Sequence, residues 1–360
     1  MKKTLFVFFT VLSLVAGAQS ITAWTDQRGY FNVFDNGSTS VVEYQPIQNF
    51  QVGGAVIAYH DFNSNFKVYY KGEVTTLYGG NVNKYMVTHN LLFYIIAGQL
   101  HVYDRGKDKT ITVNPGQYVV GDSLVGFYDN TYQSFYVYYD HDKFTLESNI
   151  INNPLVSFRA SNNTLAFVNQ QREFKVFWNG GVQKVFQLSP GMDLDYQTGS
   201  NIVAFISGVT NSLGVFYKGQ TFNVSNIPVK EYKAADDMVA YTDQNGLHAF
   251  YAGKNYDLLS AYDYSYDISD SVLVYYTSGY FRVFNKGKVS ILGNYKPEEY
   301  ALDNNTVAWI NQQGGLNAFY NDNIYDLTGF DRVMFKLEGN CLWYKSQTST
   351  NQVFLCGKKY

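Results

Sequence analysis

The sequence has few charged residues and few prolines. Of its 360 residues, 16% are charged and 6 are proline, whereas 46% are hydrophobic. Disordered chains show the opposite balance, with much charge and few large apolar residues. A folded chain with ample material for a core is therefore expected.

A strong charge of either sign and long apolar runs are also missing. The formal net charge is -3, and Lys and Arg form no block that would attract nucleic acid or anionic lipid. After the first eighteen residues, no stretch approaches the roughly 18 apolar residues of a membrane helix. The sequence thus predicts no nucleic-acid partner and no direct membrane insertion.

Aromatic residues are abundant. They make up 18% of the chain, with 33 Tyr and 27 Phe, and such residues favour strands over helices. The composition predicts an all-β protein.

The first eighteen residues, MKKTLFVFFTVLSLVAGA, form a predicted signal peptide. Lys2 and Lys3 precede an apolar run, and Ala16-Gly17-Ala18 is a small-x-small cleavage pattern. The mature chain is expected to start near Gln19 and to be periplasmic or secreted. No Cys follows the cleavage point, so no lipid anchor is indicated.

One pattern recurs through residues 19–360: an aromatic residue or Leu, any residue, Val or Ala, an aromatic residue, two further residues and Gly. Another aromatic residue lies eight to ten positions upstream of each Val or Ala. The ten central positions, spaced by 34 to 39 residues, are Val33, Val68, Val102, Val137, Val176, Val215, Ala249, Val283, Ala318 and Val353.

Each repeat is predicted to be a four-stranded antiparallel meander. In VAYTDQNGLHAFYAGK (239–254), a turn centred on Asn245-Gly246 would place Tyr241 opposite Phe250. The same counting places Tyr275 opposite Phe284, so the aromatic columns are expected to form cross-strand pairs.

Stacking of these sheets around an axis predicts a β-propeller of ten repeats of about 35 residues. The alternative, a porin-like barrel, needs strands of roughly 9–11 residues, whereas these are about five to seven. Copy one lacks a leading strand and copy ten a trailing one. The sequence does not decide between one large ring, two smaller rings and an open arc. The longer repeat spacings suggest a weak internal boundary near residues 186–201.

The two cysteines, Cys341 and Cys356, both lie in the last repeat. If Trp343 pairs with Phe354, Cys341 lies across from Cys356, so a disulfide is predicted, which exported proteins can form. Closing a loop of about 16 residues would add roughly 3 kcal/mol of stability.

No group of residues predicts catalysis, a cofactor or a metal. The GDSL stretch at 121–124 resembles the nucleophile block of GDSL esterases, but the chain lacks their Asp-x-x-His and Ser123 falls on a repeat turn. The five histidines lack metal-ligand spacing, and the aspartates of 257–270 do not fit a calcium loop. Less regular tyrosines could line a surface: Tyr44, Tyr132, Tyr262, Tyr264 and Tyr295.

The AGA-QS end of the signal and the Tyr-rich repeats resemble envelope proteins of bacteria that use type 9 secretion. That group includes soluble periplasmic accessories of the outer-membrane translocon, among them its plug component. The resemblance implies a non-enzymatic protein–protein interaction module of the periplasm or the outer-membrane periphery, which binds an outer-membrane or periplasmic complex and plugs or scaffolds a translocon. The alternative is a secreted lectin-like propeller that binds carbohydrate or peptide, although the loops between repeats share no sugar-binding pattern.

Overall fold

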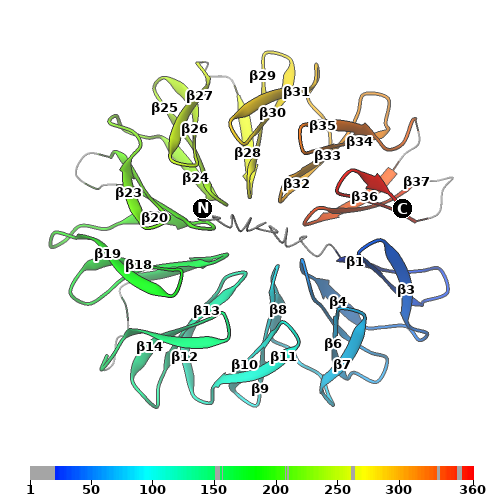
Figure 1. Cartoon of the computed structure of the whole chain (residues 1–360), viewed down its shortest axis with the longest axis horizontal. Coiled ribbons are helices and arrows are strands. Elements are labelled where there is room, and N and C mark those ends of the chain that lie inside the picture. Colours follow the sequence, from blue (N-terminus) through cyan, green and yellow to red (C-terminus); the bar gives the residue numbers. More distant parts are fainter. Residues whose placement is uncertain are drawn as a thin grey trace, which may run out of the picture.

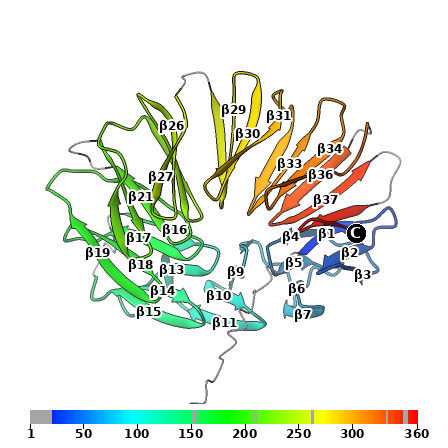
Figure 2. The same cartoon turned by 45° about the horizontal axis from the view of Figure 1, so that its top comes forward.

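The computed structural model describes residues 21–150, 155, 157–206, 208, 211–260, 264–330, 333–346 and 351–360. These residues form ten antiparallel sheets, or blades, of which nine have four strands and the first has three. Figures 1 and 2 show the blades arranged radially in chain order as a single ring. The predicted all-β ten-bladed propeller is therefore confirmed, and the ring is one rather than two.

Each complete blade runs from an inner strand near the centre of the ring through a second and a third strand to an outer strand at the perimeter (Figure 1). The inner strands are β4 (Asn49–Val52), β8 (Tyr85–Val87), β12 (Pro115–Val120), β16 (Ser157–Ser161), β20 (Asp195–Thr198), β24 (Glu231–Ala235), β28 (Ser265–Ser269), β32 (Tyr300–Asp303) and β36 (Val333–Glu338). The second strands are β1 (Ile21–Thr25), β5 (Ile57–His60), β9 (Leu91–Ile96), β13 (Leu124–Asp129), β17 (Thr164–Val168), β21 (Ile202–Ile206), β25 (Met238–Asp243), β29 (Val272–Thr277), β33 (Thr306–Ile310) and β37 (Cys341–Ser346).

The third strands are β2 (Phe31–Asp35), β6 (Phe66–Tyr70), β10 (Gln99–Asp104), β14 (Ser134–Tyr139), β18 (Glu173–Trp178), β22 (Leu213–Tyr217), β26 (Gly246–Tyr251), β30 (Tyr280–Asn285), β34 (Leu316–Tyr320) and β38 (Gln352–Leu355). The outer strands are β3 (Ser38–Glu43), β7 (Glu73–Tyr78), β11 (Lys107–Thr112), β15 (Asp142–Glu147), β19 (Gly181–Gln187), β23 (Gln220–Asn223), β27 (Lys254–Leu259), β31 (Lys288–Gly293), β35 (Asn323–Asp326) and β39 (Lys358–Lys359). Strand β39 corrects the expectation that the last repeat lacks a trailing strand.

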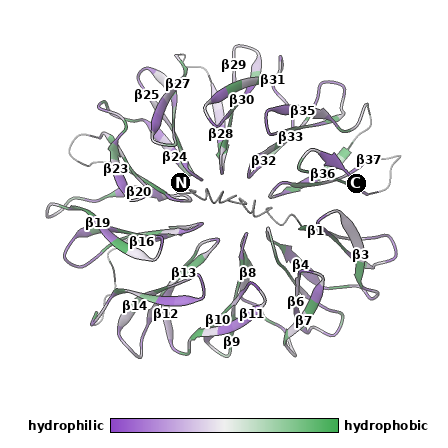
Figure 3. Cartoon of the chain, in the orientation of Figure 1, coloured by the Kyte–Doolittle hydropathy of each residue, from purple (hydrophilic) through white to green (hydrophobic). Residues whose placement is uncertain are grey.

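The second and third strands carry the core because each blade has a neighbour on both faces. The Val or Ala of every repeat is buried in a third strand, and none is more than 3% exposed. The core is divided into clusters, and one of them combines Met238, Ala240 and Ala249 of one blade with Tyr275 and Phe284 of the next. The core therefore lies between neighbouring blades, as predicted. In Figure 3, hydrophobic and hydrophilic segments occur in every blade.

The predicted cross-strand register is wrong. Tyr241 lies opposite His248 and Tyr275 opposite Arg282, so the aromatic columns are offset along one face rather than paired. The hairpin closes between Asp243 and Gly246, one residue earlier than predicted. A Cβ on Gly246 would lie 1.8 Å from the carbonyl oxygen of Leu259, so this glycine is needed for close backbone approach rather than for the centre of the turn.

The ring closes by packing of the last blade against the first. Phe34 of blade 1 lies in one cluster with Cys341, Val353 and Leu355 of blade 10. Its ring also contacts that of Tyr360, with centroids 5.3 Å apart.

Packing is also continuous across residues 186–201, where Phe186 and Phe205 have ring centroids 5.2 Å apart. The core therefore shows no break at the weak boundary suggested by repeat spacing. The predicted signal peptide, residues 1–18, lies outside the described residues. Within the described part of the chain, no helix is long and apolar enough to cross a membrane.

Candidate functional site

The meander topology gives the ring two different faces. Turns between the inner and second strands, and between the third and outer strands, lie on one side, which we call the turn face. Turns between the second and third strands, together with the connections from one blade to the next, lie on the other side, which we call the connection face. Functional residues on the two faces therefore come from different parts of each repeat.

A polar cavity of about 400 Å³ lies where the first turns of the blades converge on the turn face. Nearly all of its lining comes from the tight turn, or the residues beside it, between inner and second strand. The lining residues are Val52, Gly53, Gly54, Val87, Thr88, His89, Asn90, Asp122, Ser123, Asn162, Asn163, Ser200, Asp236, Asp270, Asp303, Asn304, Glu338 and Gly339. Nine blades therefore contribute to this one cavity.

Aspartates in this cavity connect neighbouring blades. Asp122 accepts a hydrogen bond from the backbone N–H of His89 at 3.4 Å, and Asp236 accepts one from Ser200 at 3.1 Å. Asp303 likewise accepts from the N–H of Gly339 at 2.7 Å. Part of the role of these carboxylates is thus to satisfy turn N–H groups of the adjacent blade.

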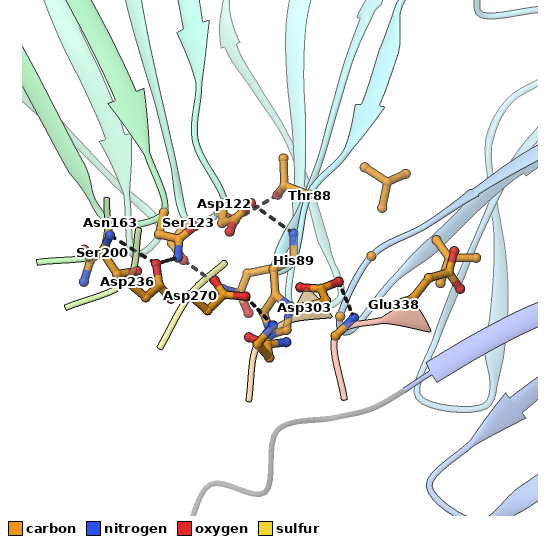
Figure 4. Close-up of a pocket in the computed structure, with 18 residues that line it drawn as sticks. Thr88, His89, Asp122, Ser123, Asn163, Ser200, Asp236, Asp270, Asp303 and Glu338 are labelled. Carbon is orange, nitrogen blue, oxygen red and sulfur yellow. Dashed lines mark hydrogen bonds between the residues drawn. The ribbon is translucent and has the colours of Figure 1, made fainter. Parts of the chain in front are cut away.

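Three of the aspartates, Asp236, Asp270 and Asp303, lie side by side in consecutive blades (Figure 4). Burial, followed by the charge of Asp270, raises the pKa of Asp236 to about 7. Burial and contacts with Asp270 also raise the pKa of Asp303 to about 7. Burial raises the pKa of Asp122 as well. Carboxylates this close cannot all ionise without mutual repulsion, so protons are retained near neutral pH.

The cavity can accept cationic or hydrogen-bond-donating groups, since carboxylates, amides and hydroxyls dominate its lining. Within the described residues, no three or more His, Cys, Asp or Glu side chains are placed to hold a metal ion. The aspartates of the 257–270 stretch are separated. Asp257 lies on outer strand β27 and pairs with His248, whereas Asp270 lies in the cavity. Asp263 lies outside the described residues.

Ser123 of the GDSL stretch also lines this cavity, on the repeat turn where the sequence places it. Its Oγ accepts a hydrogen bond from the side-chain amide of Asn90 at 2.9 Å. Among the described contacts of Ser123, none is with an imidazole. No Ser–His hydrogen bond of the kind that activates a nucleophilic serine is thus seen at Ser123 among the described residues.

The five histidines occupy separate environments, and most are engaged with neighbouring side chains. His60 contacts Asn49 at 2.9 Å and accepts a hydrogen bond from the N–H of Val82 at 3.0 Å, and burial lowers its pKa. His101 and His248, which share a repeat position, stack on Tyr94 and Tyr241 with ring centroids 5.0 Å apart in each pair. These contacts are typical of structural histidines.

The predicted Cys341–Cys356 disulfide is not formed in the structure, which holds both residues as free thiols. The register differs by one residue from the predicted one, because Cys341 lies opposite Leu355 and Trp343 opposite Val353. Successive side chains point to opposite faces of a strand, so this difference separates the two sulfurs. Cys341 is buried in the seam between blades 10 and 1, whereas Cys356 is exposed in a turn.

Alkylation of the native protein is expected to modify Cys356 rapidly and Cys341 only after unfolding. Burial raises the pKa of the Cys341 thiol and so disfavours the reactive thiolate. Mass spectrometry after iodoacetamide treatment, with and without denaturant, checks this. Detection of no free thiol in the unfolded, unreduced chain would instead support the disulfide.

The connection face carries the most exposed large apolar side chains. Among the described residues, six such side chains are at least 60% exposed: Tyr44 (70%), Phe62 (60%), Val113 (65%), Tyr132 (64%), Phe330 (83%) and Met334 (66%). Five of them lie in second turns or inter-blade connections, and Met334 is the second residue of inner strand β36, just after such a connection. Soluble proteins tend to retain exposed apolar residues grouped on one face where they bind partners.

Two of the loop tyrosines singled out in the sequence, Tyr44 and Tyr132, are among these exposed residues. Tyr295 is not, because its hydroxyl accepts a hydrogen bond from the indole of Trp309 at 3.0 Å and its ring packs on a core cluster. Tyr264 is half-buried, and Tyr262 lies outside the described residues.

The acidic cavity was not predicted from the sequence. A signal for it is nevertheless present, since YKAADD (232–237), YDISDS (266–271) and YALDNN (300–305) carry acidic or amide residues at the same turn of the repeat. These turns come together only when the blades stack side by side around the ring (Figure 4).

The chain matches the family model described as a 10-bladed beta propeller domain over residues 15–360. No curated protein matches it.

Solved structures with a similar arrangement include the computationally designed Ika8 protein, with 14% identity, a TM-score of 0.36, and coverage of 76% of this chain and 96% of its own. Hsv2p of Kluyveromyces lactis has 12% identity, a TM-score of 0.32, and coverage of 69% and 97%. Prp20p of Saccharomyces cerevisiae has 10% identity, a TM-score of 0.32, and coverage of 84% and 80%. Values this low carry no functional inference.

Proposed function

The chain belongs to the family of 10-bladed beta propeller domains, and from this premise we propose that it is a non-enzymatic protein–protein interaction module. The observation that carries the proposal is the grouping of the most exposed aromatic and apolar side chains on the connection face. Aromatic side chains provide much of the binding energy at protein interfaces. A rigid ring that presents them from several blades suits a broad protein surface.

We further propose that the module works in the bacterial periplasm or at the outer-membrane periphery, where it plugs or scaffolds a secretion translocon. The N-terminal export pattern and the resemblance to envelope proteins of type 9 secretion support this location. The partner is then an outer-membrane or periplasmic complex. Exposed aromatics on several separate loops of one face suit a broad protein surface better than a small ligand.

Affinity capture of the mature chain from detergent-solubilised bacterial envelopes tests the proposal. A stoichiometric protein partner is expected, and its retention must depend on the connection face. Glycan-array binding without any protein partner would overturn the proposal in favour of the lectin-like alternative.

Replacing Phe62 and Phe330 together by serine is expected to weaken capture of the partner at least tenfold. Both rings are largely exposed, so the free energy of unfolding should change by less than about 0.5 kcal/mol per site. Quantitative mass spectrometry of the captured material, alongside a urea unfolding curve, measures both quantities.

The matched control replaces Val289 and Ile291 by serine. These residues are also exposed (49% and 54%) and apolar, but they lie on outer strand β31 at the perimeter. Capture by this variant should equal that of the wild type. Equal loss in both variants would show that the connection face has no special role.

A further inference from the structure

Among the described residues, blade 1 differs from the other nine blades at its inner edge. In each of the others, an inner strand pairs with the second strand, as β4 pairs with β5 and β24 with β25. In the described part of the chain, second strand β1 pairs only with β2. One backbone edge of β1 therefore faces the inner-strand position of blade 1.

The repeat register shows which residues correspond to that position in the sequence. Tyr59 pairs with Phe50, Tyr94 with Tyr85 and Tyr241 with Tyr232, each nine positions upstream. Nine positions upstream of the equivalent residue Trp24 is Val15. The family match also begins at residue 15. In the sequence register alone, residues 15–18 (VAGA) therefore occupy the repeat positions that the inner strands take in the other blades.

The same four residues form the end of the predicted signal peptide. Cleavage after Ala18 would leave only Gln19 and Ser20 before β1, and these correspond to the turn residues Asp236 and Asp237 of blade 7. Two residues are too few to form both a turn and an inner strand that pairs with the five residues of β1. The mature chain would thus be unable to complete blade 1 by itself.

The inner-strand position of blade 1 has two unlike walls. On the blade 2 side, Phe50 and Val52 of β4 pack with the core cluster that contains Ile21 and Ala23. On the blade 10 side, Val333, Phe335 and Leu337 of β36 pack towards blade 9. Because successive side chains of a strand point to opposite faces, the residues between them face the inner-strand position of blade 1. The residues on this second wall are Met334, Lys336 and Glu338.

Lys336 shows how close the two walls are. Its Nζ lies 5.7 Å from the centre of the Phe50 ring, although the two residues belong to blades 10 and 2, on either side of blade 1. The same Nζ pairs with Glu338 at 2.5 Å, and Glu338 accepts a hydrogen bond from Thr22 of β1 at 2.8 Å. Lys336 is 54% exposed and Met334 66% exposed, so these side chains can move to admit an extended segment.

Two open cavities continue this position on the connection face. One of about 820 Å³ and one of about 680 Å³ are both lined by Gln27, Met334 and Lys345. The second also includes Trp343, whose buried Nε1 has no hydrogen-bond partner among the described residues. A segment leaving the inner-strand position at this end would enter these cavities and reach the exposed aromatics.

We propose that export processing exposes the inner edge of β1, and that an extended segment of the partner protein adds to it as the fourth strand of blade 1. This rests on the proposed function, whose binding mode it specifies. Strand addition draws its affinity from main-chain hydrogen bonds and its specificity from alternate side chains. The segment therefore carries apolar residues towards Phe50 and Val52, and hydrogen-bonding or acidic residues towards Lys336.

The test compares the mature chain, residues 19–360, with a chain that retains residues 15–18 behind an initiator Met. The probe is a synthetic peptide of residues 13–18 with a solubilising lysine tail. Calorimetry is expected to show at least tenfold tighter binding of the peptide to the mature chain, because the longer chain fills its own position. A peptide with proline in place of Ala16 should bind neither chain, since proline has no backbone N–H to donate a hydrogen bond to β1.

Envelope capture with both chains separates this inference from the proposed function. If the mature chain captures the partner and the longer chain does not, both the strand-addition inference and the proposed function are supported. Equal capture by both chains overturns strand addition and leaves the interaction module standing, and capture by neither chain overturns the interaction module. An exported protein whose measured mass places its N-terminus at or before residue 15 would also overturn strand addition.

Discussion

Replacing Trp309 by alanine is expected to lower the free energy of unfolding by about 3–5 kcal/mol, the usual cost of removing a fully buried large aromatic ring. Trp309 is 0% exposed and packs in the cluster shared by blades 8 and 9. Its ring meets that of Phe281 edge-on, and its indole N–H donates to Tyr295. Urea unfolding followed by circular dichroism measures the loss.

Two matched variants show whether packing between blades is the cause. Trp309→Phe keeps an aromatic ring but leaves the Tyr295 hydroxyl without this donor, so a smaller loss of about 1–2 kcal/mol is expected. Trp343→Ala removes the indole at the same repeat position in blade 10, where the ring is only half-buried, and should cost less than Trp309→Ala. Equal losses at the two tryptophans would contradict the packing account.

Replacing Asp270 by asparagine is expected to stabilise the protein at pH 8 by about 1–2 kcal/mol. Asp270 contributes, after burial, to raising the pKa of Asp236 and Asp303 to about 7. An asparagine oxygen can still accept hydrogen bonds from Ser269 and from the N–H of Asn304, so the turn is kept. The main loss is the negative charge beside Asp236 and Asp303.

The sign of the pH dependence follows from the raised pKa values. The folded protein keeps protons on Asp236 and Asp303 up to about pH 7, whereas the unfolded chain releases them near the ordinary value of 3.8. Stability from this pair is therefore greatest below about pH 4 and falls as pH rises to about 7. Asp270→Asn should flatten this fall between pH 5 and 8.

Thermal melts of the two proteins across that pH range measure the effect. The control is Asp267→Asn, a change three residues earlier at a half-exposed position that pairs with Lys233 at 3.7 Å. Asp267→Asn should give no gain that grows with pH. If Asp270→Asn lowers stability equally at pH 5 and pH 8, the carboxylates do not repel one another as described.

The sequence predicts the architecture well because each repeat carries its own evidence. Each blade needs a buried residue such as Val33 or Val283 on its third strand and a tight turn after it, and these requirements recur in every copy. The register inside a hairpin is less predictable. In the 239–254 hairpin the glycine is required by the Leu259 carbonyl beside it, which only the third and outer strands together create.

The candidate sites depend on ring closure, which no single repeat encodes. Asp236 and Asp303 are 67 positions apart in the chain and have ordinary turn positions in their own blades. The pKa values of both are raised by burial and then by Asp270, which the stacking of consecutive blades places between them. The exposure of Phe330 likewise depends on the connection between two blades, which a single repeat does not specify.

Site-specific photo-cross-linking in living cells tests the central claim, binding of a protein through the connection face, most directly. A photoreactive phenylalanine would replace Phe62 or Phe330 on that face, and Val289 at the perimeter as the control. The account predicts one cross-linked partner from positions 62 and 330 and none from position 289. Adducts from position 289 alone, or from none of the three positions, would contradict it.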